Sequence, residues 1–207
     1  LLMKVLLVNG SPHAHGATAA ALELVAKALQ ENGIETQLFF LGTGTLADCT
    51  GCGQCRQAGK CVIDDGVNQL GALAAECDGF VFGSPVYYAH ASARLLAAMD
   101  RVFYAFRNAF QSKPAAAVVT ARRAGATEAE SDIQKHFGLY GMPIVTSSYW
   151  NHTFGSLNQP GEQDAEGRST MENLGRNMAW LLKCIDLGKR SGLTPPENPK
   201  AMTNFIR

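Results

Sequence analysis

The sequence has no excess of charge, since 18 lysines and arginines balance 18 aspartates and glutamates over 207 residues. A protein that binds nucleic acid needs a cationic surface for the phosphates, so this balance argues against nucleic acid as a partner. Charged residues are also few, at 17%, whereas hydrophobic residues reach 46%, a composition that excludes a disordered chain. The chain also lacks an apolar run of the roughly 18 residues that span a membrane.

The apolar stretch after Lys4 is short and has no cleavage pattern, so we do not expect it to be a secretory signal. We therefore expect a cytoplasmic protein without a membrane partner. The length fits one domain, which buries roughly 70% of the surface of its unfolded chain without the help of disulfides. The six cysteines are therefore available for other uses, and four of them lie between Cys49 and Cys61.

Short apolar runs alternate with segments of helical periodicity along the chain. The runs predict strands at 5–8, 38–41, 79–83, 115–120 and 144–148, and the periodic segments predict helices near 22–29, 64–73, 95–106, 128–139 and 171–185. This alternation predicts an α/β protein with a three-layer, doubly wound, parallel five-stranded sheet. We expect the flavodoxin-like strand order 2-1-3-4-5, with a ligand bound where strands one and three diverge.

The predicted domain covers residues 1–190 and contains a cysteine-rich insertion at 42–66, which is too long for a simple connection. Residues 191–207, after Gly188, are expected to form a C-terminal arm. Because the carboxyl ends of parallel strands share one edge of a sheet, the loops after the first, third and fourth strands should meet there.

The loop after the first strand, residues 9–18, concentrates hydroxyls, two glycines and a helix start. Backbone amides and the positive end of a helix dipole bind an anion at such a place, with Ser11 and Thr18 as further donors. The loop lacks the GxxxxGK[ST] pattern that binds nucleoside triphosphates. An ordinary turn with Thr18 as the helix cap explains the same residues, and His13 either faces solvent or pairs with the anion.

The loops after the third and fourth strands contain aromatic and cationic residues. Residues 83–90 carry a tyrosine pair that can contact a planar ring, and residues 120–125 can bring amides and an arginine to the same crevice. Packing of Tyr87 and solvation of Arg122 and Arg123 are alternatives for each loop alone. Together, the three loops predict one site for a ligand with a phosphate tail and a flat head.

These segments resemble the flavodoxin-like, NAD(P)H-dependent FMN reductases, in the order Gly10–Thr18, Gly83–Tyr88, Arg122–Gly125 and Tyr149–Asn151. The resemblance implies FMN as cofactor and NAD(P)H as electron donor. It departs at two positions, since many relatives carry Arg and Asn where this chain has His13 and Ala17. The residues expected to bind FMN are Ser11, His13, Gly16, Ala17, Thr18, Ser84, Pro85, Val86, Tyr87, Tyr88, Thr120, Arg122, Arg123 and Gly125.

Four cysteines, Cys49, Cys52, Cys55 and Cys61, have the close spacing of iron–sulfur ligands. This segment also resembles the iron–sulfur flavoproteins, which implies a [4Fe–4S] cluster that relays electrons between flavin and an external carrier. Zinc and unligated thiols remain open, although structural zinc more often takes two separated Cys-x2-Cys pairs. The remaining two, Cys77 and Cys184, lie in apolar surroundings and are expected in the core.

Two functions remain open. The first is an FMN-dependent oxidoreductase that takes hydride from NAD(P)H and passes electrons to a quinone, a flavin or another small acceptor, with no side chain acting as acid or base. The second is an electron-transfer or redox-sensing protein without small-molecule turnover, whose partner is an electron-carrier protein. The exposed aromatics expected near Trp150 and the C-terminal arm favour a homo-oligomer, a dimer or a tetramer.

Overall fold

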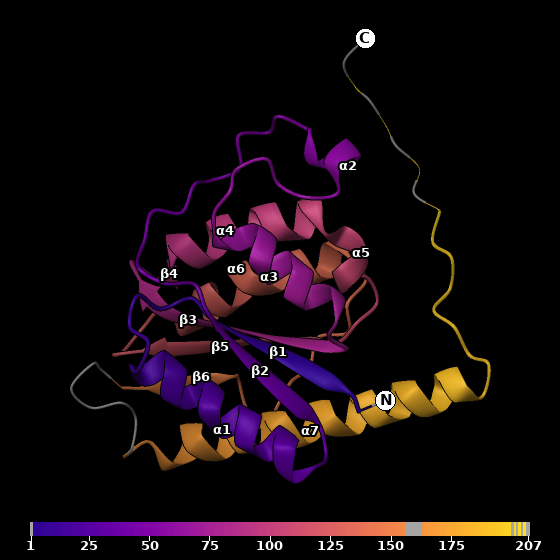
Figure 1. The fold of residues 1–207 in the computed structure, drawn as a ribbon. Coiled ribbons are helices and arrows are strands. Elements are labelled where there is room, and N and C mark those ends of the chain that lie inside the picture. Colours follow the sequence, from indigo (N-terminus) through magenta and orange to yellow (C-terminus); the bar gives the residue numbers. More distant parts are fainter. Residues whose placement is uncertain (1, 156–162, 200, 202, 204, 206–207) are drawn as a thin grey trace.

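The computed structural model describes residues 2–155, 163–199, 201, 203 and 205. A central parallel sheet separates two layers of helices (Figure 1). The parallel strands are β1 (Lys4–Asn9), β2 (Glu35–Phe40), β3 (Gly79–Tyr87), β5 (Ala115–Ala121) and β6 (His152–Phe154), in the order β2-β1-β3-β5-β6. The predicted order 2-1-3-4-5 is therefore confirmed for the parallel strands, and a short strand β4 (His90–Ala91) adds an antiparallel pair to β3.

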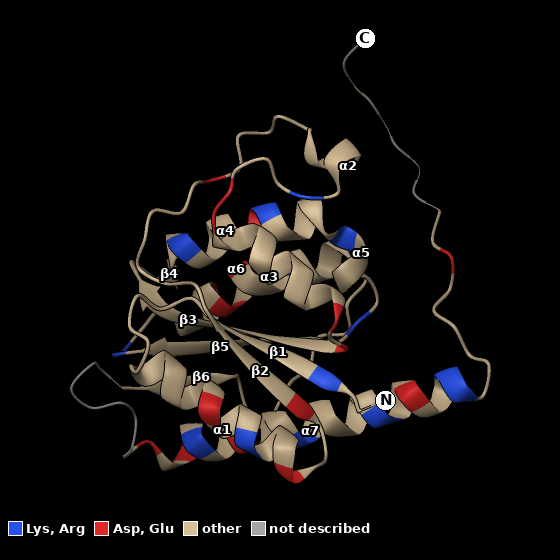
Figure 2. Ribbon diagram, in the orientation of Figure 1, with Lys and Arg blue, Asp and Glu red and all other residues tan. Residues whose placement is uncertain are grey.

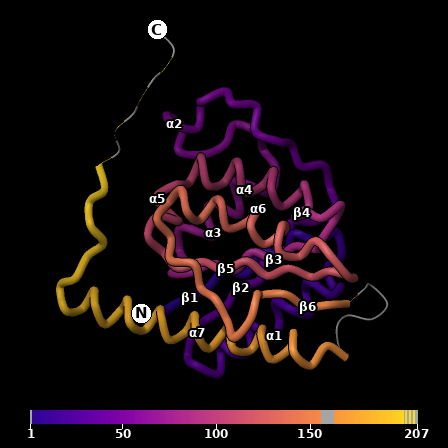
Figure 3. The backbone as a smooth tube through the Cα atoms, turned by 180° about the vertical axis from the view of Figure 1, so that it is seen from behind, coloured from indigo at the N-terminus to yellow at the C-terminus, as the bar shows by residue number. Residues whose placement is uncertain are grey.

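The two faces of the sheet are covered by different numbers of helices. One face carries α1 (Ala17–Glu31) and α7 (Ala165–Arg190), which lie side by side (Figures 1 and 3). The other carries α3 (Gly66–Ala75), α4 (Ala93–Ala105), α5 (Arg107–Phe110) and α6 (Ala126–Leu139), and the short α2 (Cys55–Ala58) lies beyond α4. None of the described helices is both long and apolar enough to cross a membrane.

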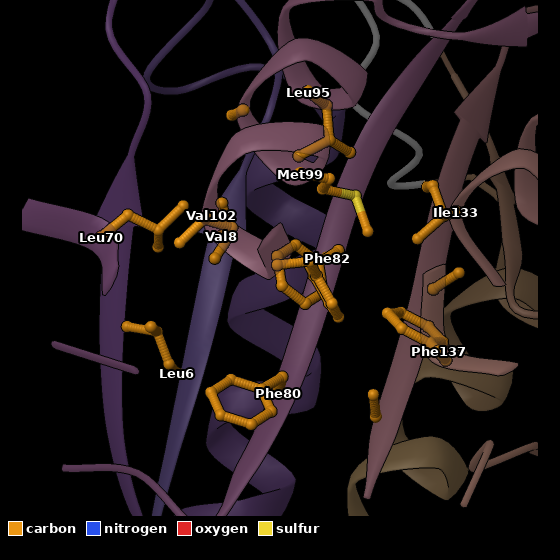
Figure 4. Close-up of a cluster of buried hydrophobic side chains, with 14 of the residues drawn as sticks. Leu6, Val8, Leu70, Phe80, Phe82, Leu95, Met99, Val102, Ile133 and Phe137 are labelled. Atoms are coloured by element: carbon orange, nitrogen blue, oxygen red, sulfur yellow. The ribbon is translucent and has the colours of Figure 1, made fainter. Parts of the chain in front are cut away.

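The strands are apolar on both sides because both faces of the sheet are covered. Along β1, Leu6 and Val8 join the cluster under α3, α4 and α6, whereas Val5 and Leu7 face α1 and α7. Figure 4 shows the first cluster, in which Phe80 and Phe82 of β3 are central. Charged residues are distributed over the helix surfaces with both signs interspersed, most visibly along α1 and α7 (Figure 2).

The last predicted strand, at 144–148, is wrong. Ile144 makes only an isolated bridge to Ala115, and the edge strand is β6, several residues later. Beyond this bridge the segment leaves β5 and is held by hydrogen bonds to α7 instead. Ser147 Oγ donates to Thr170 O at 2.6 Å, and Asn177 Nδ2 donates to Thr146 O at 2.8 Å.

The third strand is longer than predicted, since β3 continues past Gly83 to Tyr87. Its extension pairs with β5 on one side, through Pro85 and Thr120, and ends in the hairpin to β4. The residues expected in a loop are therefore held on a strand, which fixes their positions more rigidly than a loop does.

Gly175 generates a stability prediction, because it lies where α7 packs on α1. A methyl group at this position would lie 2.6 Å from Ala28 Cβ and 2.7 Å from Val25 O. We expect Gly175→Ala to lower the free energy of unfolding by about 1–3 kcal/mol, since overpacking outweighs the gain in helix propensity. Urea denaturation followed by circular dichroism measures this change.

Gly188→Ala is the matched control in the same helix. A methyl group there would meet Leu193 at 3.7 Å, an ordinary contact, so this substitution should be neutral or stabilise by up to about 1 kcal/mol. Equal effects of the two substitutions would contradict the close approach of α1 and α7.

Candidate functional site

The residue after β1 is bonded directly to the middle of β3. Gly10 N–H donates to Gly83 O at 2.9 Å, and a side chain at Gly10 would collide with that oxygen and with Leu95. Ser92, the N-cap of α4, donates from Oγ to Gly10 O at 2.8 Å, and its own N–H donates to Ser84 Oγ at 2.8 Å. The loop after β1, the second half of β3 and the start of α4 therefore form one hydrogen-bonded unit.

The loop after β1 is ordered by Asn9, which is completely buried. Its Oδ1 accepts from Ser11 N–H at 3.0 Å, and its Nδ2 donates to His13 O at 3.2 Å. Ser11 Oγ in turn accepts from His13 N–H at 3.1 Å. The amides of Ser11 and His13 are thus used within the loop, so an anion would depend on amides further along the chain.

Those amides lie at the start of α1. Gly16 is the N-cap residue and no side chain caps the helix, so Thr18 is not the cap that an ordinary turn would have required. The first amides of a helix have no partner within the helix, and they point outward with the positive end of its dipole. Gly16, Ala17 and Thr18 therefore lie where the start of α1 leaves its first amides without a side-chain cap.

A buried hydroxyl pair connects the first and fourth loops. Thr18 Oγ1 and Thr120 Oγ1 lie 2.7 Å apart, although 102 residues separate them in the chain. One hydroxyl donates to the other, so the pair keeps one O–H for a further acceptor. The predicted residues of the two loops are brought together by this contact.

The hairpin between β3 and β4 turns through Tyr88 and Ala89, which have φ values of 49° and 63°. Non-glycine residues rarely adopt this left-handed conformation, and strain of this kind is concentrated at functional sites. Tyr87 is 43% exposed and Tyr88 is 99% exposed. Gly125, with φ 87°, approaches the turn so closely that a side chain would lie 2.6 Å from Ala89 Cα.

The other residues expected to bind FMN differ in how far they are buried. Ser84 is fully buried and structural, Pro85 and Val86 are partly buried, and Arg122 and Arg123 are exposed. Arg123 also lines a cavity of about 370 Å³ together with Tyr149 and Trp150. The structure thus brings Thr18, Thr120 and the β3 hairpin together, and leaves both arginines exposed.

Sequence reasoning missed a buried pair beside this cavity. His152 Nε2 of β6 lies 2.8 Å from Glu130 Oε2 of α6, outside hydrogen-bond alignment, and both residues are buried. Gln134 Nε2 donates to the other carboxylate oxygen at 2.9 Å. The sequence could have indicated this pair, because position 130 falls on the apolar helix stripe formed by Ala126, Ile133 and Phe137, where an acidic residue is unusual.

The four clustered cysteines line a single cavity of about 230 Å³, next to α4. Cys49 and Cys52 are exposed, Cys55 and Cys61 are partly buried, and all four are free thiols. Within residues 2–155 and 163–199, no three Cys, His, Asp or Glu side chains are arranged to hold one metal ion. The predicted ligands are therefore gathered around one space, without a ready-made mononuclear site.

Arg101 of α4 fixes the end of this cysteine loop, and its side chain is only 1% exposed. Its guanidinium pairs with Asp65, the N-cap of α3, and donates from Nε and Nη2 to Cys61 Sγ at 3.3 Å each. Burial is the largest single influence and opposes the charge on both partners, yet hydrogen bonds and the attraction between the two charges together outweigh it, so the pKa of Asp65 is lowered and the pKa of Arg101 is raised.

The other two cysteines differ from each other. Cys77 is buried as predicted, and burial raises the pKa of its thiol, which makes it inert. The core prediction for Cys184 is wrong, because this residue is exposed. It lies on the outer side of α7, near the exposed Trp180 and Leu187, where the apolar neighbours in the sequence face solvent rather than the core.

We expect the protein to lose stability in acid, because protonation of Asp65 breaks its pair with Arg101. The pKa of Asp65 is lower in the folded than in the unfolded chain. The contribution of Asp65 to the free energy of unfolding is therefore complete above the unfolded pKa of about 4, and it is lost as the pH falls through the folded pKa. We expect the stability advantage of wild type over Asp65→Asn to be largest at pH 7 and to shrink below about pH 4.

Urea denaturation across this pH range measures the effect. Asp186→Asn is the control, because Asp186 pairs with Arg190 on an exposed surface and such pairs contribute little. A constant difference between wild type and Asp65→Asn from pH 7 to pH 3 would contradict the shift.

Comparisons with known proteins identify the family of the chain. The profile of the family described as NADPH-dependent FMN reductase matches residues 3–156. An iron-sulfur flavoprotein of Methanocaldococcus jannaschii is 33% identical over 193 residues, which cover 88% of this chain and 99% of that protein. An iron-sulfur flavoprotein of Methanosarcina thermophila is 28% identical over 188 residues, with 88% and 97% covered.

Solved structures support the fold. A flavone reductase superposes with a TM-score of 0.67 at 17% identity, over 89% of this chain and 64% of that one. An archaeal flavodoxin superposes with a TM-score of 0.60 at 16% identity, over 87% of this chain and 99% of that one. The fold is therefore flavodoxin-like, and the chain belongs to the NADPH-dependent FMN reductase family, with iron-sulfur flavoproteins among its relatives.

Proposed function

We propose that the protein is an FMN-dependent oxidoreductase that takes hydride from NAD(P)H and passes the electrons to an acceptor through a [4Fe–4S] cluster. Family membership supports a flavin-dependent oxidoreductase with FMN as cofactor. The observation that carries the proposal is the convergence of three loops at one sheet edge, through Gly10 with Gly83, Thr18 with Thr120, and Gly125 with Ala89.

The residues of this edge fit the phosphate end of FMN. The uncapped amides at Gly16–Thr18 and the hydroxyl of Thr18 supply neutral donors, and the helix dipole adds about 0.3–1 kcal/mol. The chain has His13 in place of the arginine of many relatives, and the His13 amide is already used by Ser11. Phosphate binding therefore depends mainly on backbone amides and hydroxyls rather than on a cation.

The tyrosines at the end of β3 and the arginines after β5 fit the flavin ring. Tyr87 and Tyr88 offer exposed aromatic faces at the end of β3, and the strained turn holds them in place. Arg122 or Arg123 would stabilise the negative charge that a reduced flavin carries. When bound, FMN supplies the redox chemistry: it accepts hydride from a nicotinamide and passes on one or two electrons, while the protein positions it.

The cysteine cavity also supports a cluster. All four clustered cysteines line one cavity of about 230 Å³, and their close spacing in the sequence is typical of iron–sulfur ligands, whereas structural zinc more often takes two separated Cys-x2-Cys pairs. Exposed Cys49 and Cys52 would place the cluster near the surface, where a carrier protein can approach.

We also propose a homo-oligomer. Tyr88, Trp150 and Trp180 are large apolar side chains with exposed fractions of 99%, 56% and 67%. Such side chains are concentrated in interfaces between proteins. A second subunit over the β3 hairpin would cover Tyr88 and shield the flavin ring from water.

Thr18 gives a test of the phosphate site. Thr18→Val keeps the shape of the side chain but removes the hydroxyl that pairs with Thr120, so FMN should bind at least about tenfold more weakly, as expected for the loss of one hydrogen bond to a charged group. Quenching of flavin fluorescence during titration of the apoprotein measures the dissociation constant. Thr36→Val, which removes a surface hydroxyl on β2 bonded to Gln30, should bind FMN as wild type does.

The function itself is tested by anaerobic purification, followed by analysis of FMN, iron and sulfide and by assays of NADH and NADPH oxidation. We expect Cys52→Ser to lose iron and sulfide, keep FMN and fail to reduce a carrier protein, whereas Cys184→Ser behaves as wild type. Steady oxidation with a quinone or free flavin supports the enzyme. Fast transfer to a carrier without turnover favours the electron-transfer protein, and absence of FMN from a reconstituted sample rejects both.

A further inference from the structure

One face of α4 holds the cysteine loop at several points. Arg94 Nη2 donates to Thr43 O at 3.2 Å near the start of the loop. Seven residues later, Arg101 donates to Ala47 O and Ile63 O at 3.1 Å each. Tyr104, three residues further, accepts a hydrogen bond from Arg56. Because positions 94, 101 and 104 lie on one side of a helix, the loop takes its shape from α4 and not only from its cysteines.

The guanidinium of Arg101 uses all its N–H groups in this task. Nη1 bonds to Ala47 O and Asp65, Nη2 bonds to Ile63 O, Asp65 and Cys61 Sγ, and Nε bonds to Cys61 Sγ. A planar fork with five N–H groups can serve these partners at once, whereas an ammonium group with three cannot. In the described structure, Cys61 is the one of the four clustered cysteines whose sulfur accepts side-chain hydrogen bonds.

Cys61 is also fixed on its backbone. Its N–H donates to Asn68 Oδ1 at 2.9 Å, and its carbonyl accepts from Asn68 Nδ2 at 2.9 Å. Asn68 belongs to α3, the helix that Asp65 caps. Arg101 and Asn68 thus hold Cys61 from α4 and α3, whereas Cys49 and Cys52 are exposed and lie in a segment without regular secondary structure.

We propose that Arg101 is a positioning residue for the cluster: it holds the Cys61 sulfur as the fourth ligand and raises the reduction potential of the cluster. This inference rests on the proposed function, since it needs the cluster at these cysteines. One-electron reduction adds one negative charge to the iron, sulfide and thiolate atoms. N–H groups directed at a ligand sulfur, and a buried positive charge beside it, stabilise that charge and so favour the reduced state.

The test compares Arg101→Gln and Arg101→Lys with Arg94→Gln, the matched control. Arg94→Gln removes the same charge from the same face of α4, but Arg94 bonds to a backbone carbonyl and not to a sulfur. Each full-length protein is purified anaerobically with its cofactors, analysed for iron and sulfide, and titrated with dithionite while the reduced cluster is followed by electron paramagnetic resonance. The flavin potential, followed by absorbance, is the internal reference.

We expect Arg101→Gln to lower the ratio of reduced to oxidised cluster at a fixed potential by at least tenfold, which is about 59 mV for one electron. Arg101→Lys should lie between this variant and wild type, because it keeps the charge but cannot serve both Asp65 and the sulfur. Both should change the resonance spectrum of the cluster, and Arg94→Gln should change neither quantity. If Arg101→Gln does not fold because Asp65 is left unpaired, the cluster potential of Arg101→Lys decides whether the inference holds.

Cluster potentials that are the same in wild type and in the folded Arg101 variants would overturn the inference and leave the proposed function intact. A shift of equal size in Arg94→Gln would also overturn it, because a general loss of charge would then be the cause. Wild-type protein that binds FMN but contains neither iron nor sulfide would overturn this inference together with the cluster part of the proposed function.

Discussion

The hydrogen bond from Gly10 to Gly83 joins the first and third strands at the point where the sheet reverses its strand order, and the rest of the candidate site depends on it. It requires a residue without a side chain at position 10, since a Cβ would lie 2.7 Å from Leu95 Cβ. Ser92 reinforces it from α4 by bonding to both strands' loops. With these loops locked, the amides at the start of α1 and the β3 hairpin keep fixed positions, so little ordering remains when a ligand binds.

Much of this arrangement could be predicted from the sequence, because local patterns and topology rules determine it. Continuous apolar runs identified four strands. Their alternation with helices predicted the doubly wound sheet, for which 2-1-3-4-5 is the flavodoxin-like order. The fifth strand was misplaced, since Ile144–Val145 is as apolar as a strand but bonds to β5 only at Ala115, after which Ser147 Oγ and the Thr146 carbonyl bond to α7. Those bonds join residues far apart in the sequence, which no local pattern reveals.

The site was predictable at the level of segments and less so at the level of contacts. The residue types of Thr18 and Thr120 suggested a polar edge, but their separation of 2.7 Å follows only from the fold. Arg101 was missed for a similar reason. It is a cation on the buried side of its helix, and its partners Cys61 and Asp65 are some 40 residues earlier in the chain. A charged residue within a buried helical stripe, as at Arg101 and Glu130, indicates a buried partner even when the partner cannot be named.

Helix α4 connects the two parts of the candidate machinery. Its N-cap, Ser92, supports the flavin edge, and Arg101 supports the cysteine cavity, nine residues further along. A helix rises about 1.5 Å per residue, so the two supports are separated by about 14 Å along a rigid axis. Both are buried, at 3% and 2% exposure, and Leu95, Ala98 and Met99 fix the helix to the sheet between them. Because one packed element holds both sites, the distance between a bound flavin and a bound cluster would be set by the hydrophobic core and not by the exposed cysteine loop.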